Sequence, residues 1–181
     1  TVGLACQQFS HHYQRARGLY ITRENVDLMG DMVHNFPSQD VRIIVVTDSQ
    51  GILGIGDIGV GGMAVPIGKL SLYSIGAGIH PSFCLPIALD IGTDNEELLQ
   101  DPLYLGIGHK RIKGQEYYDV IDKFVNNIKE HFPKAIIQWE DFSKRHSFEI
   151  LDKYKEVLPS YNDDIQTTGA VVLAGIINAM K

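Results

Sequence analysis

Cysteines, long apolar runs and clusters of basic residues are all scarce in this chain. Only Cys6 and Cys84 occur among 181 residues, and both lie in apolar surroundings. They indicate buried thiols in a reducing compartment, not a disulfide framework, so we expect a cytoplasmic protein. No apolar run reaches the length of a membrane span, and the opening residues show no signal-peptide pattern, so we expect no contact with a membrane.

The charge balance is acidic, with a formal net charge of -6 and a pI of about 5.6. A nucleic-acid-binding protein usually presents a basic face, so we expect no nucleic-acid partner. The composition, 44% hydrophobic and 21% charged, fits one globular domain with an adequate core. There is no initiator Met, and the chain stops at Lys181 directly after a helical pattern. We therefore expect an excerpt of a longer protein.

Apolar periodicity predicts strands that alternate with helices. Helices are expected over residues 4–17, 24–36, 115–131, 145–155 and 165–180, with another that starts near Pro66. Strands are expected over residues 19–21, 41–46, 52–55, 84–90 and 135–139. This alternation predicts a layered α/β fold with a largely parallel sheet.

Acidic residues follow several of the expected strands. Asp48, Asp90 and the pair Glu140-Asp141 all come at the carboxyl ends, where binding sites form in open parallel sheets. A second acidic pair, Asp163-Asp164, precedes the last expected helix, and because neighbouring side chains diverge, its members should serve different partners. Two acidic pairs could hold a hard cation such as Mg2+ or Mn2+. The alternative is that Asp163 or Asp164 caps the last helix.

Two further motifs each allow a functional and a structural interpretation. The string Gly54-Ile-Gly-Asp-Ile-Gly59 matches the GxGxxG pattern of dinucleotide sites. Because no helix is expected to begin at its third glycine, a tight loop is the better interpretation. Lys69, set among apolar residues, either extends its amine to solvent or is partly buried with a lowered pKa and acts as a base. The seven histidines lack metal-site spacing, and we expect surface or capping roles for them.

Four strings, taken in order and spacing, resemble the malic enzymes and the related malolactic enzymes. They are Val45-Val-Thr-Asp48, Ile52-Leu-Gly-Ile-Gly-Asp-Ile-Gly59, Gly92-Thr-Asp-Asn95 with Asp101-Pro-Leu-Tyr104, and Trp139-Glu-Asp-Phe142 leading to Asn162-Asp-Asp-Ile-Gln166. The resemblance covers essentially the whole chain. It implies that residues 1–181 form the N-terminal substrate- and metal-binding domain, without the NAD-binding Rossmann domain of the family.

The resemblance also implies a reaction and a set of site residues. Such an enzyme oxidatively decarboxylates L-malate to pyruvate and CO2 with NAD or NADP, and we expect a homo-oligomer at full length. By the family's motifs, Glu140, Asp141 and Asp164 bind Mg2+ or Mn2+. Lys69 is the general base, and Asp163 is a second catalytic residue that holds it in place.

The sequence departs from the family pattern at three points, one of which is Thr167, where a Gly usually follows Ile-Gln. Gly51, which the resemblance places with Asp164 among the cofactor-binding residues, stands where most malic enzymes have an Arg that binds the malate carboxylate. The Tyr that serves the family as general acid lies upstream of the string matched by Thr1, so we expect residues 1–181 alone to be inactive. Gly51 is closer to the malolactic branch, which makes lactate. The remaining alternative is a non-catalytic domain that keeps the fold.

Overall fold

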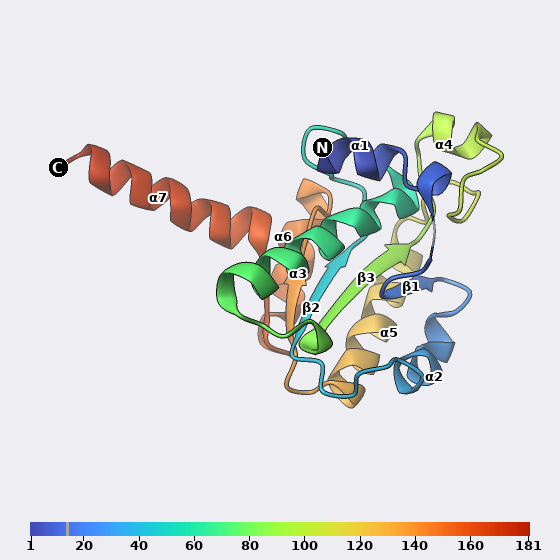
Figure 1. The fold of residues 1–181 in the computed structure, drawn as a ribbon, viewed down its shortest axis with the longest axis horizontal. Helices are drawn as coiled ribbons and strands as arrows, with labels where there is room; N and C mark the ends of the chain where they lie inside the picture. The colour runs from blue at the N-terminus through green and yellow to red at the C-terminus, as the bar shows by residue number, and fades with distance from the viewer. Residues whose placement is uncertain (14) are drawn as a thin grey trace.

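A parallel sheet forms the centre of the computed structural model, which describes residues 1–13 and 15–181 (Figure 1). Within that part of the chain the sheet has five strands, and every neighbouring pair is parallel. Their order is β1 (Leu19–Thr22), β3 (Cys84–Asp90), β2 (Ile43–Thr47), β4 (Ile136–Trp139) and β5 (Ser160–Asn162). The predicted α/β fold with a parallel sheet is confirmed.

Helices cover both faces of the sheet because side chains along each strand alternate between the faces. The helices are α1 (Val2–Gln7), α2 (Met29–His34), α3 (Ala64–Ala77), α4 (Glu96–Gln100), α5 (Gln115–His131), α6 (Lys144–Tyr154) and α7 (Thr168–Ala179). On one face, Ile44 and Trp139 join the main core with Phe124 of α5. On the other, Val45 packs with Leu70 of α3. Every residue of β2 is buried, as expected for a strand covered on both sides.

Several predicted elements match the structure, and others were wrong. The strand over 84–90 and the helix over 115–131 have the predicted bounds. The helix predicted over 4–17 ends at Gln7, and a short 3-10 turn, Ser10–His12, follows it; position 14 lies outside the described residues. The helix predicted over 24–36 is a 3-10 turn, Val26–Leu28, followed by α2. β5 was not predicted, because three residues are too few to show a periodicity.

The strand predicted over residues 52–55 is instead a tight loop. Ile52 pairs with Gly56 in an isolated bridge, and Gly54 and Gly56 have φ values of 78° and 83°. These left-handed conformations favour glycine and turn the chain back on itself. Gly59, with φ 50°, begins a 3-10 turn that ends at Met63, directly before α3. The tight-loop interpretation of the GxGxxG string is therefore confirmed.

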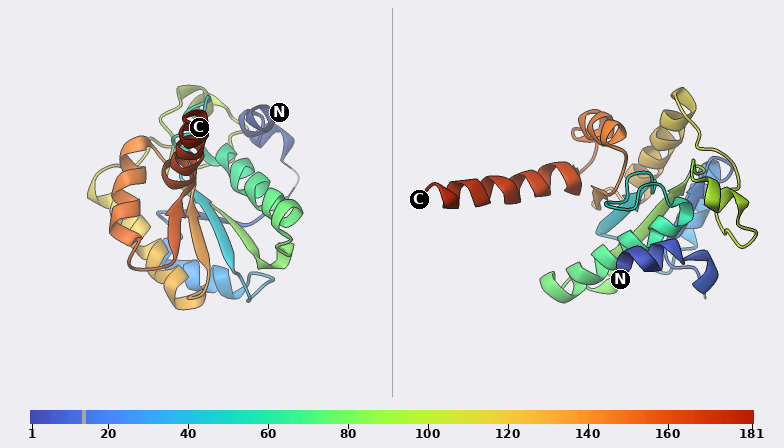
Figure 2. Two further views of the ribbon diagram at one scale, coloured as in Figure 1. Left: turned by 90° about the vertical axis from the view of Figure 1, so that its left-hand side faces the viewer. Right: turned by 90° about the horizontal axis from the view of Figure 1, so that it is seen from above.

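Helix α7 projects away from the body of the molecule (Figures 1 and 2). Its apolar side chains face outward all round, with exposed fractions of 68% for Val171, 57% for Leu173 and 51% for Ile176. A helix that is apolar on every side is usually covered by other parts of a protein. Over the described residues, each helix is too short or too polar to cross a lipid bilayer.

Candidate functional site

Three carboxylates meet where the chain leaves β4 and β5. Glu140 and Asp141 directly follow β4, and the Glu140 N–H donates to the Val46 carbonyl at 2.9 Å, which continues the ladder with β2. Asp164 lies in a π-helical turn, Asp163–Thr167, that follows β5. One oxygen from each of the three lies within 4.8 Å of the others. Glu140, Asp141 and Asp164 are called the carboxylate cluster below.

The π-helical turn is capped by a different residue from the one predicted. The side-chain oxygen of Asn162, not that of Asp163 or Asp164, accepts a hydrogen bond from the Ile165 N–H at 2.9 Å. The capping interpretation of the acidic pair was therefore wrong. As expected for adjacent residues, the two carboxylates diverge: Asp163 pairs with Lys69, whereas Asp164 accepts a hydrogen bond from the Asp141 N–H at 3.0 Å.

The electrostatics of the carboxylate cluster favour a cation. Glu140 and Asp141 are buried, and Asp164 is exposed. Burial, and after it the charges of Glu140 and Asp164, raises the pKa of Asp141 to about 7. Mutual repulsion of this kind is relieved by a positive charge, and carboxylate oxygens are the ligands that Mg2+ and Mn2+ prefer. The residues therefore fit a hard divalent cation, and they line one side of a cavity of about 380 Å³ whose other walls include Val2, Ile52 and Val65.

Lys69 lies on α3 beside the cluster. Its amine is 3.0 Å from Glu140 Oε1 and also donates to Asp163 Oδ2. Burial alone would lower the pKa of Lys69, but the bond to Asp163 and the charge of Glu140 outweigh it and raise that pKa. The amine is therefore held by two carboxylates and does not extend to solvent. The partial burial agrees with the second interpretation, but the raised pKa contradicts the lowered pKa it assumed. The role of Lys69 as a base stays a prediction.

Gly51 contacts the turn that carries two of the three acids. Its N–H donates to the Asp141 carbonyl at 2.8 Å. A Cβ added at Gly51 would lie 2.5 Å from the Phe142 carbonyl oxygen, so any side chain at this position requires the backbone to move. Asp141 itself has a φ of 54°, a conformation in which non-glycine residues are uncommon. Gly51 therefore borders the carboxylate cluster through its backbone.

Sequence reasoning missed three residues behind Glu140. The side-chain amide of Gln138 donates to Glu140 Oε2 at 2.6 Å, and its carbonyl oxygen accepts from Tyr73 and Tyr161. A polar residue inside the apolar strand Ile136-Ile-Gln-Trp139 was the available signal, because a fully buried amide needs partners.

Asp48 and Asp90, predicted at the same sheet edge, lie outside the carboxylate cluster. Asp48 belongs instead to a buried network with Arg111, Asp57, Tyr117 and His146, called the Arg111 network below. Arg111 Nε and Nη2 donate to Asp57 at 2.7 and 2.9 Å, and the Tyr117 hydroxyl donates to Asp48 at 2.9 Å. His146 stacks on Tyr117 with ring centroids 4.1 Å apart, so it is an exception to the surface or capping roles predicted for the histidines.

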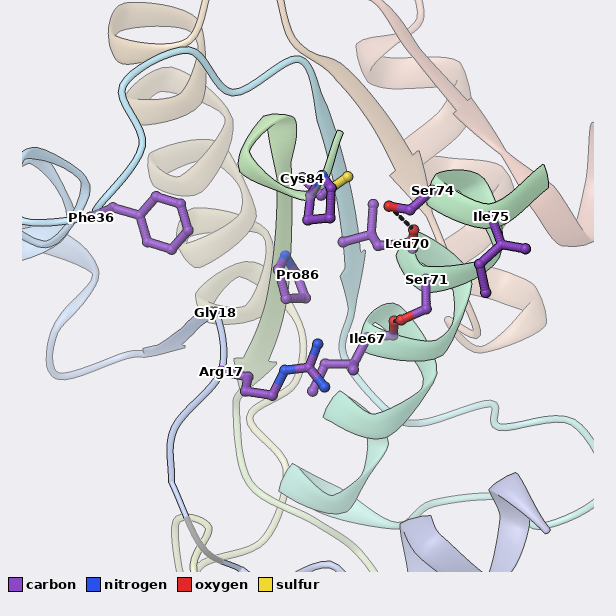
Figure 3. Close-up of a pocket in the computed structure, with 11 residues that line it drawn as sticks. Arg17, Gly18, Phe36, Ile67, Leu70, Ser71, Ser74, Ile75, Cys84 and Pro86 are labelled. Atoms are coloured by element: carbon purple, nitrogen blue, oxygen red, sulfur yellow. Dashed lines mark hydrogen bonds between the residues drawn. The ribbon is translucent and has the colours of Figure 1, made fainter. Parts of the chain in front are cut away.

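Another groove, of about 410 Å³, lies between α3 and β3 (Figure 3). Ile67, Leu70, Cys84 and Pro86 form its apolar walls, and Arg17 extends over it. Its lining, as far as the chain is described, includes none of the acids of the carboxylate cluster. Cys6 and Cys84 are both free and buried, as predicted.

Comparison with known proteins points to one family. The sequence model described as "Malic enzyme, N-terminal domain" matches residues 1–155. NAD-dependent malic enzymes of Shewanella denitrificans and Aeromonas hydrophila are each 49% identical over all 181 residues. The chain spans only 32% of the length of these two relatives.

Solved structures agree. A malic enzyme from Pyrococcus horikoshii superposes with a TM-score of 0.54 and 28% identity, over 87% of this chain and 30% of its own. The malic enzyme of Entamoeba histolytica gives a TM-score of 0.56 and 29% identity, over 86% of this chain and 29% of its own. The resemblance read from the four sequence strings is confirmed.

Proposed function

Because the chain belongs to the malic enzyme family, we propose that it forms the substrate- and metal-binding part of an NAD-dependent enzyme that converts L-malate to pyruvate and CO2. The curated relatives are named NAD-dependent malic enzymes, which supports NAD as the cofactor and pyruvate as the product. The observation that carries the proposal is the carboxylate cluster within 4.8 Å, with the Lys69 amine 3.0 Å from Glu140.

Glu140, Asp141 and Asp164 would hold Mg2+ or Mn2+ in this proposal. When bound, the ion supplies Lewis acidity toward the oxygen that becomes the ketone. Glu140 would then be shared between two positive groups, which leaves Asp163 as the main partner of Lys69. Asp163 accepts a hydrogen bond from the amine and so fixes its position beside the cluster.

Lys69 would act as the base that removes the proton of the malate C2 hydroxyl. NAD+ would supply the acceptor for the C2 hydride. The Lys69 amine, after giving up the proton that its carboxylate partners favour, would take the proton of the C2 hydroxyl and leave a ketone. The C3–C4 bond would then break, CO2 would depart, and a general acid would protonate C3 to give pyruvate. A base within reach of the hydroxyl typically contributes about 10²- to 10⁴-fold to the rate.

Titration of the full-length protein with Mn2+ tests the metal assignment. We expect Asp164→Asn to lower the affinity for Mn2+ by at least roughly 100-fold. Substitution of a residue that only supports a metal ligand usually lowers metal affinity by less than this. Glu97→Gln, at an exposed acid in the first turn of α4, is the matched control and should bind like wild type. Equal affinity for Mn2+ in Asp164→Asn and wild type would refute the metal assignment.

Lys69→Ala separates the base from the metal site. We expect the full-length variant to lose malate-dependent NADH formation and to keep Mn2+ binding, because the three proposed ligands remain. Near-normal turnover by this variant would show that another group takes the proton.

A further inference from the structure

A layer of three polar residues, one buried and two half-buried, lies directly behind the proposed site. Gln138 of β4 is fully buried, and its amide nitrogen donates to Glu140 Oε2 at 2.6 Å. The Gln138 amide oxygen accepts from the Tyr161 hydroxyl at 2.7 Å and from the Tyr73 hydroxyl, and these two hydroxyls are 3.2 Å apart. We call these residues the Tyr73–Gln138–Tyr161 triad.

The spacing of side chains along a helix or a strand sets the position of each triad member. Tyr73 follows Lys69 by four residues on α3, so the two side chains share one helix face. Gln138 precedes Glu140 by two residues in an extended segment, which puts both on one side of the sheet.

Tyr161 lies on β5 and precedes Asp163 by two residues. Tyr161 donates to Gln138, and Asp163 accepts from Lys69, so both side chains lie on the side of the sheet that carries the site. Each of the three segments thus contributes one residue to an outer layer and one to an inner layer. The outer layer consists of Lys69, Glu140 and Asp163, and the inner layer is the triad. Within each segment, the inner residue lies on the same side as the outer one.

Glu140 and the two tyrosines together fix the orientation of the Gln138 amide. An ionised carboxylate only accepts hydrogen bonds, so Glu140 requires the NH2 end of the amide. The amide oxygen then points away from Glu140, and both phenol hydroxyls donate to it. The reversed amide would set its oxygen against Glu140 and leave the buried carboxylate without this donor, which is costly.

Glu140 is consequently fixed at both oxygens. Oε1 lies 3.0 Å from the Lys69 amine, and Oε2 accepts from Gln138. A carboxylate held at both oxygens keeps its orientation when a cation binds to it. Groups that orient a ligand are known to control metal affinity even though they never touch the ion.

We propose that the Tyr73–Gln138–Tyr161 triad positions Glu140 for a divalent cation, with the tyrosines acting through the Gln138 amide. This inference rests on the proposed function of the carboxylate cluster. All three are positioning residues, and Tyr73 and Tyr161 act from behind the site.

Mn2+ titration of full-length variants tests the proposal. Gln138→Leu keeps similar bulk but removes the donor to Glu140, and we expect affinity for Mn2+ to fall about 10- to 100-fold. The double variant Tyr73→Phe/Tyr161→Phe keeps Gln138 and both rings, and removes the two donors that hold the amide oxygen in place. We expect a loss of roughly tenfold. Tyr118→Phe, which removes a phenol donor to Glu149 at an exposed position, is the matched control and should bind like wild type.

The double variant keeps the proposal testable if Gln138→Leu fails to fold. Electron paramagnetic resonance of the bound Mn2+ adds a readout that a purely structural role would not change. We expect an altered spectrum in the double variant and a wild-type spectrum in Tyr118→Phe.

The results separate the two proposals. If wild type does not bind Mn2+, the metal assignment itself fails. If wild type binds and Asp164→Asn does not, while the double tyrosine variant keeps wild-type affinity and spectrum, the carboxylate cluster stands and the positioning role of the triad is refuted.

Discussion

The carboxylate cluster and the Arg111 network lie at the carboxyl ends of strands in one sheet, and they balance their charges differently. In the Arg111 network, burial alone would raise the pKa of Asp57, but the hydrogen bonds from Arg111 outweigh it and lower that pKa. In the cluster, burial and then the charges of Glu140 and Asp164 raise the pKa of Asp141 to about 7, although the Lys69 amine lies 3.0 Å from Glu140. Arg111 thus outweighs burial at Asp57, whereas Lys69 does not outweigh burial and repulsion at Asp141.

This difference distinguishes a structural ion network from a binding site. Buried charges are tolerated when each has an opposite partner and hydrogen bonds, as Arg111 and Asp57 do. In the carboxylate cluster the Lys69 amine pairs with Glu140 and with Asp163, and Asp141 has no such partner within the described residues. A further cation would lower the repulsion at Asp141.

Removal of Arg111 should have the largest effect on stability, and it tests whether Arg111 neutralises the buried acids around it. Arg111→Met leaves Asp57 and Asp48 without their buried cation, and we expect a loss of about 3–5 kcal/mol in the free energy of unfolding. Urea-induced unfolding followed by circular dichroism measures the loss. Arg145→Met, at an exposed pair with Glu149, is the control and should change stability by less than about 1 kcal/mol. If the two variants lose equal stability, the Arg111 network is not a neutralised ion network.

Removing the charge of an acid in the carboxylate cluster should have the opposite effect and raise the free energy of unfolding. Because the pKa of Asp141 is raised to about 7 by folding, the native state keeps a proton that the unfolded state has already released. Stability of the metal-free wild type should therefore fall as pH rises from about 4 to about 7.

Asp141→Asn removes that dependence. We expect the metal-free variant to be more stable than wild type by roughly 2–4 kcal/mol at about pH 8, with little difference near pH 4. Urea unfolding at both pH values measures the gap. A variant less stable than wild type at the higher pH would show that the cluster is already neutralised.

Gly51 sharpens the comparison, because it joins the turn after Asp48 to the backbone of Asp141. Gly51→Ala places a methyl group 2.5 Å from the Phe142 carbonyl oxygen, and we expect a loss of roughly 1–3 kcal/mol. Gly68→Ala is the matched control: it lies in α3, and its added Cβ meets nothing within 4 Å. That variant should gain about 0.5–1 kcal/mol. Thermal unfolding of the pair gives the difference, and similar values would refute the close contact at Gly51.

Much of the fold could be predicted from periodicity, because long segments carry repeated information. The 17 residues of α5 show one apolar face, and six of the seven residues of β3 are buried. Short elements carry too little: β5 has three residues, and the loop at Gly54 is determined by left-handed glycines that a strand pattern hides.

The two charge clusters could not be told apart from sequence. Asp48, Asp90 and Glu140-Asp141 all lie at the carboxyl ends of strands, so the sheet rule predicted all of them equally. What separates them is the partner, and Arg111 lies 54 residues from Asp57 in sequence. The family motifs selected Glu140, Asp141 and Asp164, which the structure brings together; their role as ligands stays a prediction. Gln138 was missed because its two tyrosine partners come from other segments.

Helix α7 has a consequence for how the chain behaves in water. Its ring of bare valine, leucine and isoleucine side chains attracts the same surface on other molecules. Residues 1–181 alone should cluster through these helices, more strongly in sulfate or phosphate salts and more weakly in the cold. The segment that follows the proposed metal site would then also control how readily residues 1–181 associate in solution.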